Sequence, residues 1–599
     1  MSRKFCFTAL ALITLLTAIS LGGCGSGNKE GMSIGFTRIS EAACAQCHGQ
    51  AVSAVTGQSL YGGWQQASHF LLSVNPNDPF RGADQTARAD CQRCHGGGNA
   101  HNGIGPIQFP KPDVAGICAQ CHNAATFAAK APQHVTSVSF LDINSNTVTS
   151  ATYMDSISKC TNCHDPHDTK LTARFGTILD GIDPDTGMVG LYGDWAASGH
   201  GDTQGAPWTD EDFGSPKTGG GVCARCHSAS GYKLYLANPH AGNWAWKTGI
   251  AANDTNKEVL RCDGCHTDYS FTRRVGATNG VAGAAGAALL PYSTTIPTGS
   301  LSGNKLSNAG DSNLCVNCHS GRQSGTFIAT RASFGQLSSS SFGGFNSHYM
   351  AAAGILYDII GYEGYQTSHS RYVPVGFLHN RIGLDLGLTI PATGASLGNN
   401  RGPCVGCHYT DPTTGAFFSH TLDAFVGTMG LTGTVTAPSV VCATCHVNGS
   451  SLQLQAADLN TLKSQYKAGL DAIDTLLSAR YGITHNPAVY PYFSAATGST
   501  IHWNTLAKAG GDTSAVRGDP GRHLVGAAFN DNLLTREPGA YAHNQQYSMT
   551  LIYDTIDYLE DGAVTGTLNG TSYVPLATLQ AIFSVPVDGV TPVTARPIP

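Results

Sequence analysis

One five-residue pattern, Cys-x-x-Cys-His, occurs nine times between residues 44 and 446 of this 599-residue chain. The cysteine pairs are Cys44 and Cys47, Cys91 and Cys94, Cys118 and Cys121, Cys160 and Cys163, Cys223 and Cys226, Cys262 and Cys265, Cys315 and Cys318, Cys404 and Cys407, and Cys442 and Cys445. The histidines that follow them are His48, His95, His122, His164, His227, His266, His319, His408 and His446. This spacing attaches c-type haem, whose vinyl groups bond to the two thiols while the adjacent histidine binds the iron. The sequence therefore predicts nine covalently bound haem c groups, with these histidines as the proximal iron ligands.

The cysteine count leaves little room for another use of these thiols. The nine motifs take eighteen of the twenty cysteines, and only Cys6 and Cys24 remain. A disulfide framework or a set of four-cysteine zinc sites would also use many cysteines, but neither needs a histidine after every pair. Haem attachment is therefore the favoured interpretation, and no cysteine is left as a free nucleophile.

The N-terminus has the features of a bacterial lipoprotein signal. A short basic start, Met1 to Lys4, precedes an apolar run that ends in Leu21-Gly22-Gly23-Cys24. This ending resembles a lipobox, in which the cysteine is lipidated and becomes the first mature residue. We expect residues 1–23 to be a signal peptide, Cys24 to carry the lipid and residues 24–43 to form a flexible linker; the alternative is an uncleaved membrane anchor. Gly25 in place of an aspartate favours the outer membrane, on its periplasmic or its cell-surface side.

Composition favours an irregular chain that wraps around its cofactors. Glycine contributes 73 of the 599 residues and charged residues only 12%, which suits loops that pass close to flat macrocycles. The hydrophobic content of 41% argues against a disordered chain. We expect mostly irregular coil with short α-helices around a covalent haem stack, and little β-structure. Nucleic-acid binding is not expected, because the net charge is −6 and there is no basic run.

The motif positions, and the helical apolar spacing that begins after residue 450, divide the chain into regions. We expect haem regions at 44–276, with motifs one to six, and at 305–450, with motifs seven to nine, separated by a loop at 277–304 rich in Gly, Ala, Ser and Thr. Residues 451–599 are predicted to form a helical cap and tail. Apolar spacings of three and four mark two longer helices there, one with Leu459, Leu462, Tyr466, Leu470, Ile473 and Leu477, the other with Met549, Ile552, Ile556 and Leu559 and ended by Gly562. We expect these helices to pack on the last haems rather than to bind a partner.

The second axial ligand of each iron must come from elsewhere in the chain. The nine motif histidines leave fourteen of the 23, whereas the whole chain has only seven methionines. Histidine can therefore supply every iron with a second ligand and methionine cannot. Paired histidines imply low to moderate reduction potentials, because methionine ligation raises the potential. His167 lies too close to His164 to reach the far side of the same haem, so we expect it to bind a neighbouring haem.

Several local strings accompany the motifs: Cys94-His95-Gly-Gly-Gly-Asn-Ala-His101, Cys163-His164-Asp-Pro-His167, Ser198-Gly-His200, Ser347-His348-Tyr349, Leu378-His379-Asn380-Arg381 and Pro538-Gly-Ala-Tyr-Ala-His543. Together with the motifs and the lipobox-like ending, they resemble the outer-membrane multihaem c-type cytochromes of metal-reducing bacteria over most of the mature chain. In that family such strings commonly carry distal iron ligands. The resemblance therefore implies, as distal ligands, His69, His101, His134, His167, His200, His348, His379, His420 and His543, with His240 in reserve.

The resemblance implies a relay that passes electrons outward through closely spaced bis-histidine haems at the outer membrane. Other cytochromes would be its electron donors, metal or other extracellular compounds its acceptors, and an outer-membrane porin a candidate partner. No substrate chemistry of its own is expected. Two alternatives stay open: a multihaem reductase of nitrite, hydroxylamine or a sulfur oxyanion with one open iron, and a subunit of a haem filament. The lysine variant of the motif that often marks the open iron in nitrite-reducing relatives does not occur here, and a lipid on Cys24 argues against free polymerisation.

Overall fold

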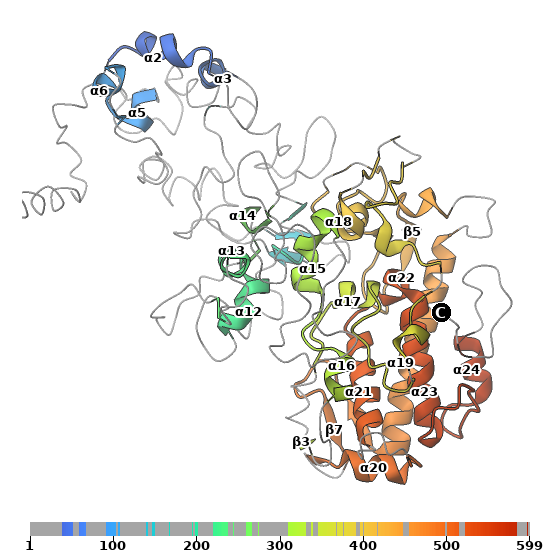
Figure 1. The fold of residues 1–599 in the computed structure, drawn as a ribbon. Coiled ribbons are helices and arrows are strands. Elements are labelled where there is room, and N and C mark those ends of the chain that lie inside the picture. The colour runs from blue at the N-terminus through green and yellow to red at the C-terminus, as the bar shows by residue number, and fades with distance from the viewer. Residues whose placement is uncertain are drawn as a thin grey trace, which may run out of the picture. The chain divides into compact units, whose positions relative to one another are not determined.

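Short helices and irregular coil predominate in the computed structural model, and β-structure is sparse (Figure 1), as the sequence predicts. The described residues are 39–51, 59–66, 91–103, 220–237, 309–330, 346–446 with gaps of up to three residues, 454–496, 500–513 and 521–583, together with short pieces between residues 106 and 338 and Arg596. The predicted signal peptide, Cys24 and the loop at 277–304 lie outside them. The chain forms two units, residues 1–130 with 159–174 and residues 131–158 with 175–599.

All sheets among the described residues are antiparallel pairs of short strands. The pairs are β1 (Ser139–Leu141) with β2 (Thr147–Thr149), β3 (Leu337–Ser338) with β8 (Thr500–Ile501), β4 (Phe425–Gly427) with β5 (Val435–Pro438), and β6 (Ile483–His485) with β7 (Phe493–Ala495). In the last pair, His485 lies opposite Phe493. Among the described helices, none combines the length and the apolar character needed to cross a membrane.

Most haem motifs of the described chain lie on short helices that end at the motif histidine. These helices are α2 (Glu41–His48) for motif one, α5 (Cys91–His95) for motif two, α12 (Gly220–His227) for motif five, α15 (Asn313–His319) for motif seven and α18 (Gly402–His408) for motif eight. Motif six lies on α14 (Cys262–Cys265) and motif nine on the 3-10 turn η7 (Cys442–Thr444). Motifs three and four lie outside the described residues. One helical turn suits the motif, because residues three apart lie on the same face and can present both thiols to one haem edge.

In the first unit, α3 (Leu60–Gln66) and α6 (Asn99–Asn102) accompany the two motif helices. The side chain of Gln92 in α5 joins the segments around them. Its Nε2 donates to the Ile39 carbonyl at 2.7 Å, and its Oε1 accepts from the Ile39 amide at 2.8 Å. The same oxygen accepts from the Gly98 amide at 3.1 Å, directly before α6. One buried amide thus fixes the approach to α2 and the connection from α5 to α6.

In the second unit, short elements join the motif helices, bury small apolar clusters and contribute Ile328 and Ile355 to the large C-terminal core. They are α13 (Ala229–Ala237), η3 (Gly310–Ser312), α16 (Gly325–Thr330), α17 (Ala352–Leu356), η5 (His369–Arg371) and η6 (His379–Arg381). One cluster holds Ala309, Val316, Ala353, Leu356 and Tyr357. Polar contacts supply further links: the Ser312 hydroxyl donates to the Arg401 carbonyl at 2.8 Å and accepts from the Val405 amide at 3.0 Å. Ser312 therefore holds α15 and α18 together.

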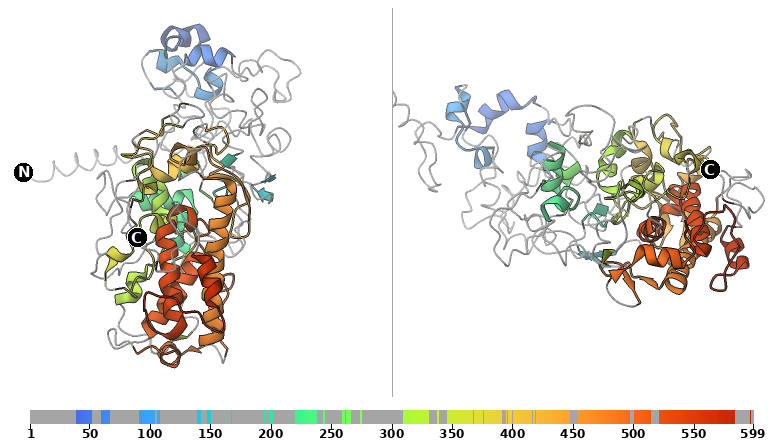
Figure 2. Two further views of the ribbon diagram at one scale, coloured as in Figure 1. Left: turned by 90° about the vertical axis from the view of Figure 1, so that its right-hand side faces the viewer. Right: turned by 60° about the horizontal axis from the view of Figure 1, so that its bottom comes forward.

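The C-terminal part of the second unit has longer helices and a large apolar core. Its helices are α19 (Ala456–Tyr481), α20 (Trp503–Ala509), α21 (Gly521–Thr535), α22 (Ala540–His543), α23 (Gln545–Asp561) and α24 (Leu576–Ile582). Figures 1 and 2 show α19, α21 and α23 side by side, in orange and red. Gln455 and Asp458 form a capping box at the start of α19, and Gly482 ends it with a φ of 65°. Gly562 ends α23 with a φ of 87°, at the residue where the sequence places its end.

Helix α21, with 15 residues, is nearly as long as α23 with 17, yet apolar spacing does not reveal it. Every residue from Gly521 to Leu534 is buried, so the helix has no polar face and no one-sided apolar stripe. Its polar side chains find partners inside the protein. The side chain of Asn530 accepts from the Tyr362 amide at 2.7 Å and donates to the Tyr362 carbonyl at 3.0 Å. Such pairing allows a helix with buried polar residues to lie at the centre of a core.

Candidate haem-binding sites

Six motif histidines each lie against one histidine from outside the motifs. We number these sites by their motif. The pairs are His48 and His101 at site 1, His95 and His167 at site 2, His227 and His348 at site 5, His319 and His200 at site 7, His408 and His543 at site 8, and His446 and His379 at site 9. Their ring centroids are 6.2, 6.0, 5.9, 6.2, 6.1 and 6.3 Å apart, in the same order. Every partner is one of the distal candidates that the family resemblance implies.

This spacing fits a metal ion held between two imidazoles. An imidazole nitrogen binds a transition metal at about 2.0 Å, and the ring centroid lies about 1.1 Å beyond that nitrogen, so two axial imidazoles have centroids about 6.2 Å apart. Aromatic rings in direct contact also lie about 4.5 to 7 Å apart, so the distance alone decides little. The narrow range from 5.9 to 6.3 Å, always between one motif and one other histidine, points to a common occupant. The residues present therefore fit haem c, with one histidine on each axial side.

Burial keeps several of these imidazoles neutral, which is the form that binds a metal. It lowers the pKa of His200, His227 and His408 to about 4 each. It also lowers the pKa of His348, to about 3, with the neighbouring His227 and nearby arginines adding to the effect. Neutral rings carry a lone pair on one nitrogen, so these sites offer iron a ligand without first losing a proton.

Hydrogen bonds on the outer ring nitrogen orient four of the paired histidines. The Nδ1 of His319 lies 3.2 Å from the Met350 carbonyl, that of His379 lies 2.9 Å from the Ala542 carbonyl, and that of His408 lies 2.7 Å from the Leu422 carbonyl. A carbonyl only accepts, so Nδ1 carries the proton and Nε2 keeps its lone pair for the iron. The Nδ1 of His543 instead donates to the Glu537 carboxylate at 2.9 Å.

Cysteine contacts bring sites 5, 7 and 8 next to one another. The thiols of Cys226 and Cys318 lie close enough to shift each other's pKa, as do those of Cys315 and Cys404. In a haem-loaded protein these sulfur atoms would be thioethers, so the contacts stand for the proximity of two haem edges rather than for a lasting hydrogen bond. Site 7 therefore lies between sites 5 and 8.

Short backbone segments connect the same series of sites. His348 belongs to site 5, and two residues later the Met350 carbonyl accepts the hydrogen bond of His319 at site 7. His543 belongs to site 8, and the preceding Ala542 carbonyl accepts that of His379 at site 9. The described residues therefore place four sites in the order 5, 7, 8 and 9.

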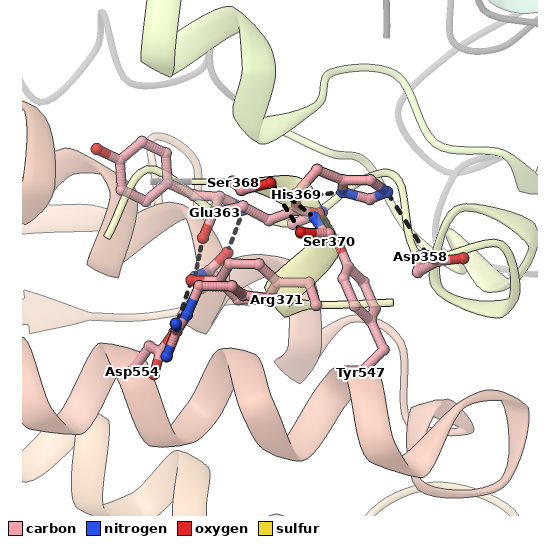
Figure 3. Close-up of polar contacts among 12 residues, drawn as sticks. Asp358, Glu363, Ser368, His369, Ser370, Arg371, Tyr547 and Asp554 are labelled. Carbon is pink, nitrogen blue, oxygen red and sulfur yellow. Dashed lines mark hydrogen bonds and ion pairs between the residues drawn. The ribbon is translucent and has the colours of Figure 1, made fainter. Parts of the chain in front are cut away.

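Three further histidines are bound to carboxylates of the protein itself. Figure 3 shows His369 between two acids: its Nδ1 lies 2.6 Å from Glu363 and its Nε2 3.7 Å from Asp358. The hydrogen bond to Glu363 raises the pKa of His369 against the opposing effect of burial. His523 lies 3.8 Å from Asp512. None of these histidines is a predicted haem ligand, and their environments differ from those of the six pairs.

His485 lies between Asp531 at 2.9 Å and Asp474 at 3.2 Å, both measured from its Nδ1. The three ligand atoms lie within 4.8 Å of one another, close enough to hold a divalent cation. Burial alone would lower the pKa of His485, but the two carboxylates outweigh it and raise the pKa to about 10. A protonated His485 thus balances part of the carboxylate charge, and no metal ion is needed to explain the cluster.

Three of the nine distal candidates remain, of which the structure describes only His420. The ring of His420 lies 5.0 Å from that of Tyr409, and its backbone amide donates to Asp194. His69, His134 and the reserve His240 lie outside the described residues, as do motif histidines His122, His164 and His266. Glu537 is the site residue that sequence reasoning misses. Its only signal is its position six residues before His543.

Comparison with curated proteins gives relatives along almost the whole chain. The protein named "C-type polyheme cytochrome OmcB" in two strains of Geobacter sulfurreducens is 26% identical over 769 aligned residues, which cover 94% of this chain and 95% of the relative. The protein named "C-type polyheme cytochrome OmcC" from the same species is 26% identical over 792 aligned residues, covering 94% and 96%. The predicted resemblance to multihaem c-type cytochromes of metal-reducing bacteria is confirmed. No protein-family model and no solved structure matches the chain.

Proposed function

We propose that this chain is a multihaem c-type cytochrome that relays electrons through closely spaced haems, each held by two histidines. The observation that carries the proposal is the series of sites 5, 7, 8 and 9, joined by thiol contacts and by backbone segments one or two residues long. Haem would supply reversible one-electron transfer at its iron. The two histidines of each described pair would occupy both open positions of an iron and leave none for a substrate, which favours a relay over an enzyme.

Individual roles follow from this proposal. Histidine pairs of the six described sites would be the axial ligands, and the motif cysteines would fix each haem covalently. Site 7 would receive or pass electrons between sites 5 and 8, since Cys318 contacts Cys226 and Cys315 contacts Cys404. The remaining three of nine proposed haems, at motifs three, four and six, would draw distal ligands from His69, His134 and His420.

We place the relay at the outer membrane, attached through a lipid on Cys24. The lipobox-like Leu21 to Cys24 supports this location, and the relatives are polyhaem cytochromes by name. Other cytochromes would deliver electrons, directly or beside a porin partner, and extracellular metal or other oxidants would take them. Replacing Cys24 with serine should move the protein from the membrane fraction to the soluble fraction without changing its haem content.

The decisive experiment is spectroscopy of the purified holoprotein. A pyridine haemochrome assay should give nine haems per chain, and electron paramagnetic resonance (EPR) of the oxidised protein should show only low-spin haem. Reduced protein should reoxidise rapidly with soluble ferric citrate. A high-spin haem together with turnover of nitrite or hydroxylamine would replace the relay by a reductase.

A pair of variants tests the histidine assignments directly. His348→Ala should convert one low-spin haem to high-spin, because it removes one ligand of site 5. His369→Ala is the matched control, since His369 is bound to Glu363 and should leave every haem low-spin. Equal effects of the two variants, or none from His348→Ala, would contradict the assignment.

A further inference from the structure

Site 8 differs from its neighbours in what lies behind its distal histidine. At sites 7 and 9, a backbone carbonyl accepts the Nδ1 proton of His319 or His379. At site 8, the Leu422 carbonyl accepts the Nδ1 proton of His408, but the carboxylate of Glu537 accepts that of His543 at 2.9 Å. Of these four histidines, only His543 has a charged acceptor.

The local chain is built to hold this carboxylate in place. The Glu537 side chain is only 3% exposed. Its amide donates to the Leu534 carbonyl at 3.2 Å, and its own carbonyl accepts from the Ala540 amide at 3.1 Å. The Tyr466 hydroxyl, from α19, bonds to the Leu534 carbonyl at 2.7 Å. Glu537 is thus fixed by the end of α21 and by the core, not by His543 alone.

Gly539 lets the acid and the imidazole approach each other. A Cβ atom at this position would lie 2.8 Å from Cε1 of His543 and 3.3 Å from Oε1 of Glu537. The first distance is shorter than ordinary van der Waals contact, so a side chain at residue 539 would push the ring away. The amide of His543 also donates to the Gly539 carbonyl at 2.9 Å, which sets the ring position from the backbone.

We propose that Glu537 lowers the reduction potential of the haem at site 8 below the potentials of sites 7 and 9. This inference rests on the proposed function, because it takes His408 and His543 as ligands of one iron. A carboxylate acceptor draws the Nδ1 proton and makes the imidazole a stronger electron donor to the iron. Its negative charge also favours Fe(III) over Fe(II), since reduction adds one electron and removes one positive charge without making or breaking a bond. Burial strengthens both effects by excluding water.

The test is an EPR-monitored redox titration of the holoprotein and its variants. Glu537→Gln keeps the size of the side chain and removes its charge. We expect one low-spin signal to be reduced at higher potential, with its ratio of oxidised to reduced iron at a fixed potential falling roughly tenfold, which is about 59 mV for one electron. The signal of site 7 should shift less and in the same direction, because the charge of Glu537 also acts on His319.

Glu363→Gln is the matched control. Glu363 also binds a histidine, His369, at 2.6 Å, and it also accepts from Tyr547 at 2.8 Å. His369 is not paired with a described motif histidine, so this variant should leave all potentials unchanged. Equal shifts in the two glutamine variants would overturn the proposal, because they would reflect charge removal in general.

His543→Met identifies the signal of site 8. It also tests the ligand assignment at this site separately from the role of Glu537. If this variant changes no haem signal, the ligand assignment fails. If it changes one signal and Glu537→Gln leaves that signal's potential unmoved at normal haem content, the ligand assignment stands and the role of Glu537 is wrong. Should Glu537→Gln not accumulate, Glu537→Asp retains the charge but shortens the reach, and a smaller upward shift is expected; no shift would again overturn the role.

Discussion

Two histidines of the haem part of the second unit, residues 309–446, differ in their surroundings from one histidine of its C-terminal part, residues 454–583. Buried histidines of the haem part lie against other histidines, and burial lowers the pKa of His348 to about 3 and of His408 to about 4. His485 in the C-terminal part lies between carboxylates, which raise its pKa to about 10. The first arrangement leaves lone pairs for a metal, whereas the second makes a cation that the protein itself neutralises.

The two parts also differ in what fills their interiors. One large core holds fully buried apolar side chains of the C-terminal part, among them Ile473, Leu476 and Leu551, and the haem part adds side chains such as Ile328 and Ile355 to it. The clusters that the haem part forms without the C-terminal helices are small, such as the one formed by Ile382, Ile390, Leu397 and Val441. We infer that the C-terminal part is stabilised by its own side chains, and that the haem part depends on its cofactors for much of its buried surface.

The largest expected effect comes from removing one haem. Replacing Cys315 and Cys318 with serine should eliminate the haem of site 7, and with it the contact surface between α15 and its neighbours. Amide hydrogen exchange should show loss of protection in residues 313–330, while residues 456–481 keep theirs. Haem content should fall by one per chain. Uniform loss of protection across both parts would show that the two do not differ in their dependence on haem.

A core substitution in the C-terminal part should have the reverse pattern. Ile473 is fully buried in α19, and Ile473→Ala should lower the free energy of unfolding of this part by about 3 kcal/mol through lost contacts and a cavity. Far-ultraviolet circular dichroism in urea measures the loss, and the EPR spectrum of the haems should stay unchanged. Ser478→Ala, at an exposed position of the same helix, should change stability by less than about 0.5 kcal/mol. Altered haem spectra in Ile473→Ala would show that the core supports the sites directly.

The same contrast explains which elements the sequence predicts. Helix α19 buries one main face, and α23, although buried from Tyr547 to Glu560, keeps apolar residues at spacings of three and four and ends at Gly562, so the sequence reveals both. Helix α21 is buried on all sides, and burial of Asn530 and Asp531 breaks the expected apolar pattern. Helix formation there depends on tertiary partners such as Tyr362, which no local window contains.

Site residues divide in a similar way. The fixed Cys-x-x-Cys-His spacing allows the motif cysteines and histidines to be predicted from the sequence. The local strings predict six further histidines, which lie against motif histidines in the structure. The sequence does not predict which histidine pairs with which motif, because the paired residues come from distant segments, as with His200 and His319. The sequence also does not predict the roles of Glu537 and the Ala542 carbonyl, since only the folded backbone brings them to the Nδ1 atoms of His543 and His379.

A smaller effect should appear in the pH dependence of stability. The folded-state pKa of His485 is raised above its ordinary value of 6.5, so its stabilising contribution is complete below about pH 6.5 and is lost as the pH rises towards about 10. We expect a decrease of roughly 1–2 kcal/mol in the free energy of unfolding of the C-terminal part over this range, reduced by solvent near the half-exposed Asp474. His485→Gln should lack this decrease. Parallel pH curves for the two proteins would mean that His485 is not protonated in the folded state.

The smallest effect is expected from an exposed ion pair on α19. The Nζ atom of Lys467 lies 2.6 Å from Asp471 one turn later, with both side chains largely exposed to water. Such pairs contribute about 0.3–0.5 kcal/mol, so Lys467→Ala should lower the urea midpoint only slightly, and less in high salt. Asp471→Ala should give a similar change, since either variant removes the same pair. A loss as large as that from Ile473→Ala would mean that α19 depends on its surface charges, and the C-terminal part would then not be stabilised mainly by its buried apolar core.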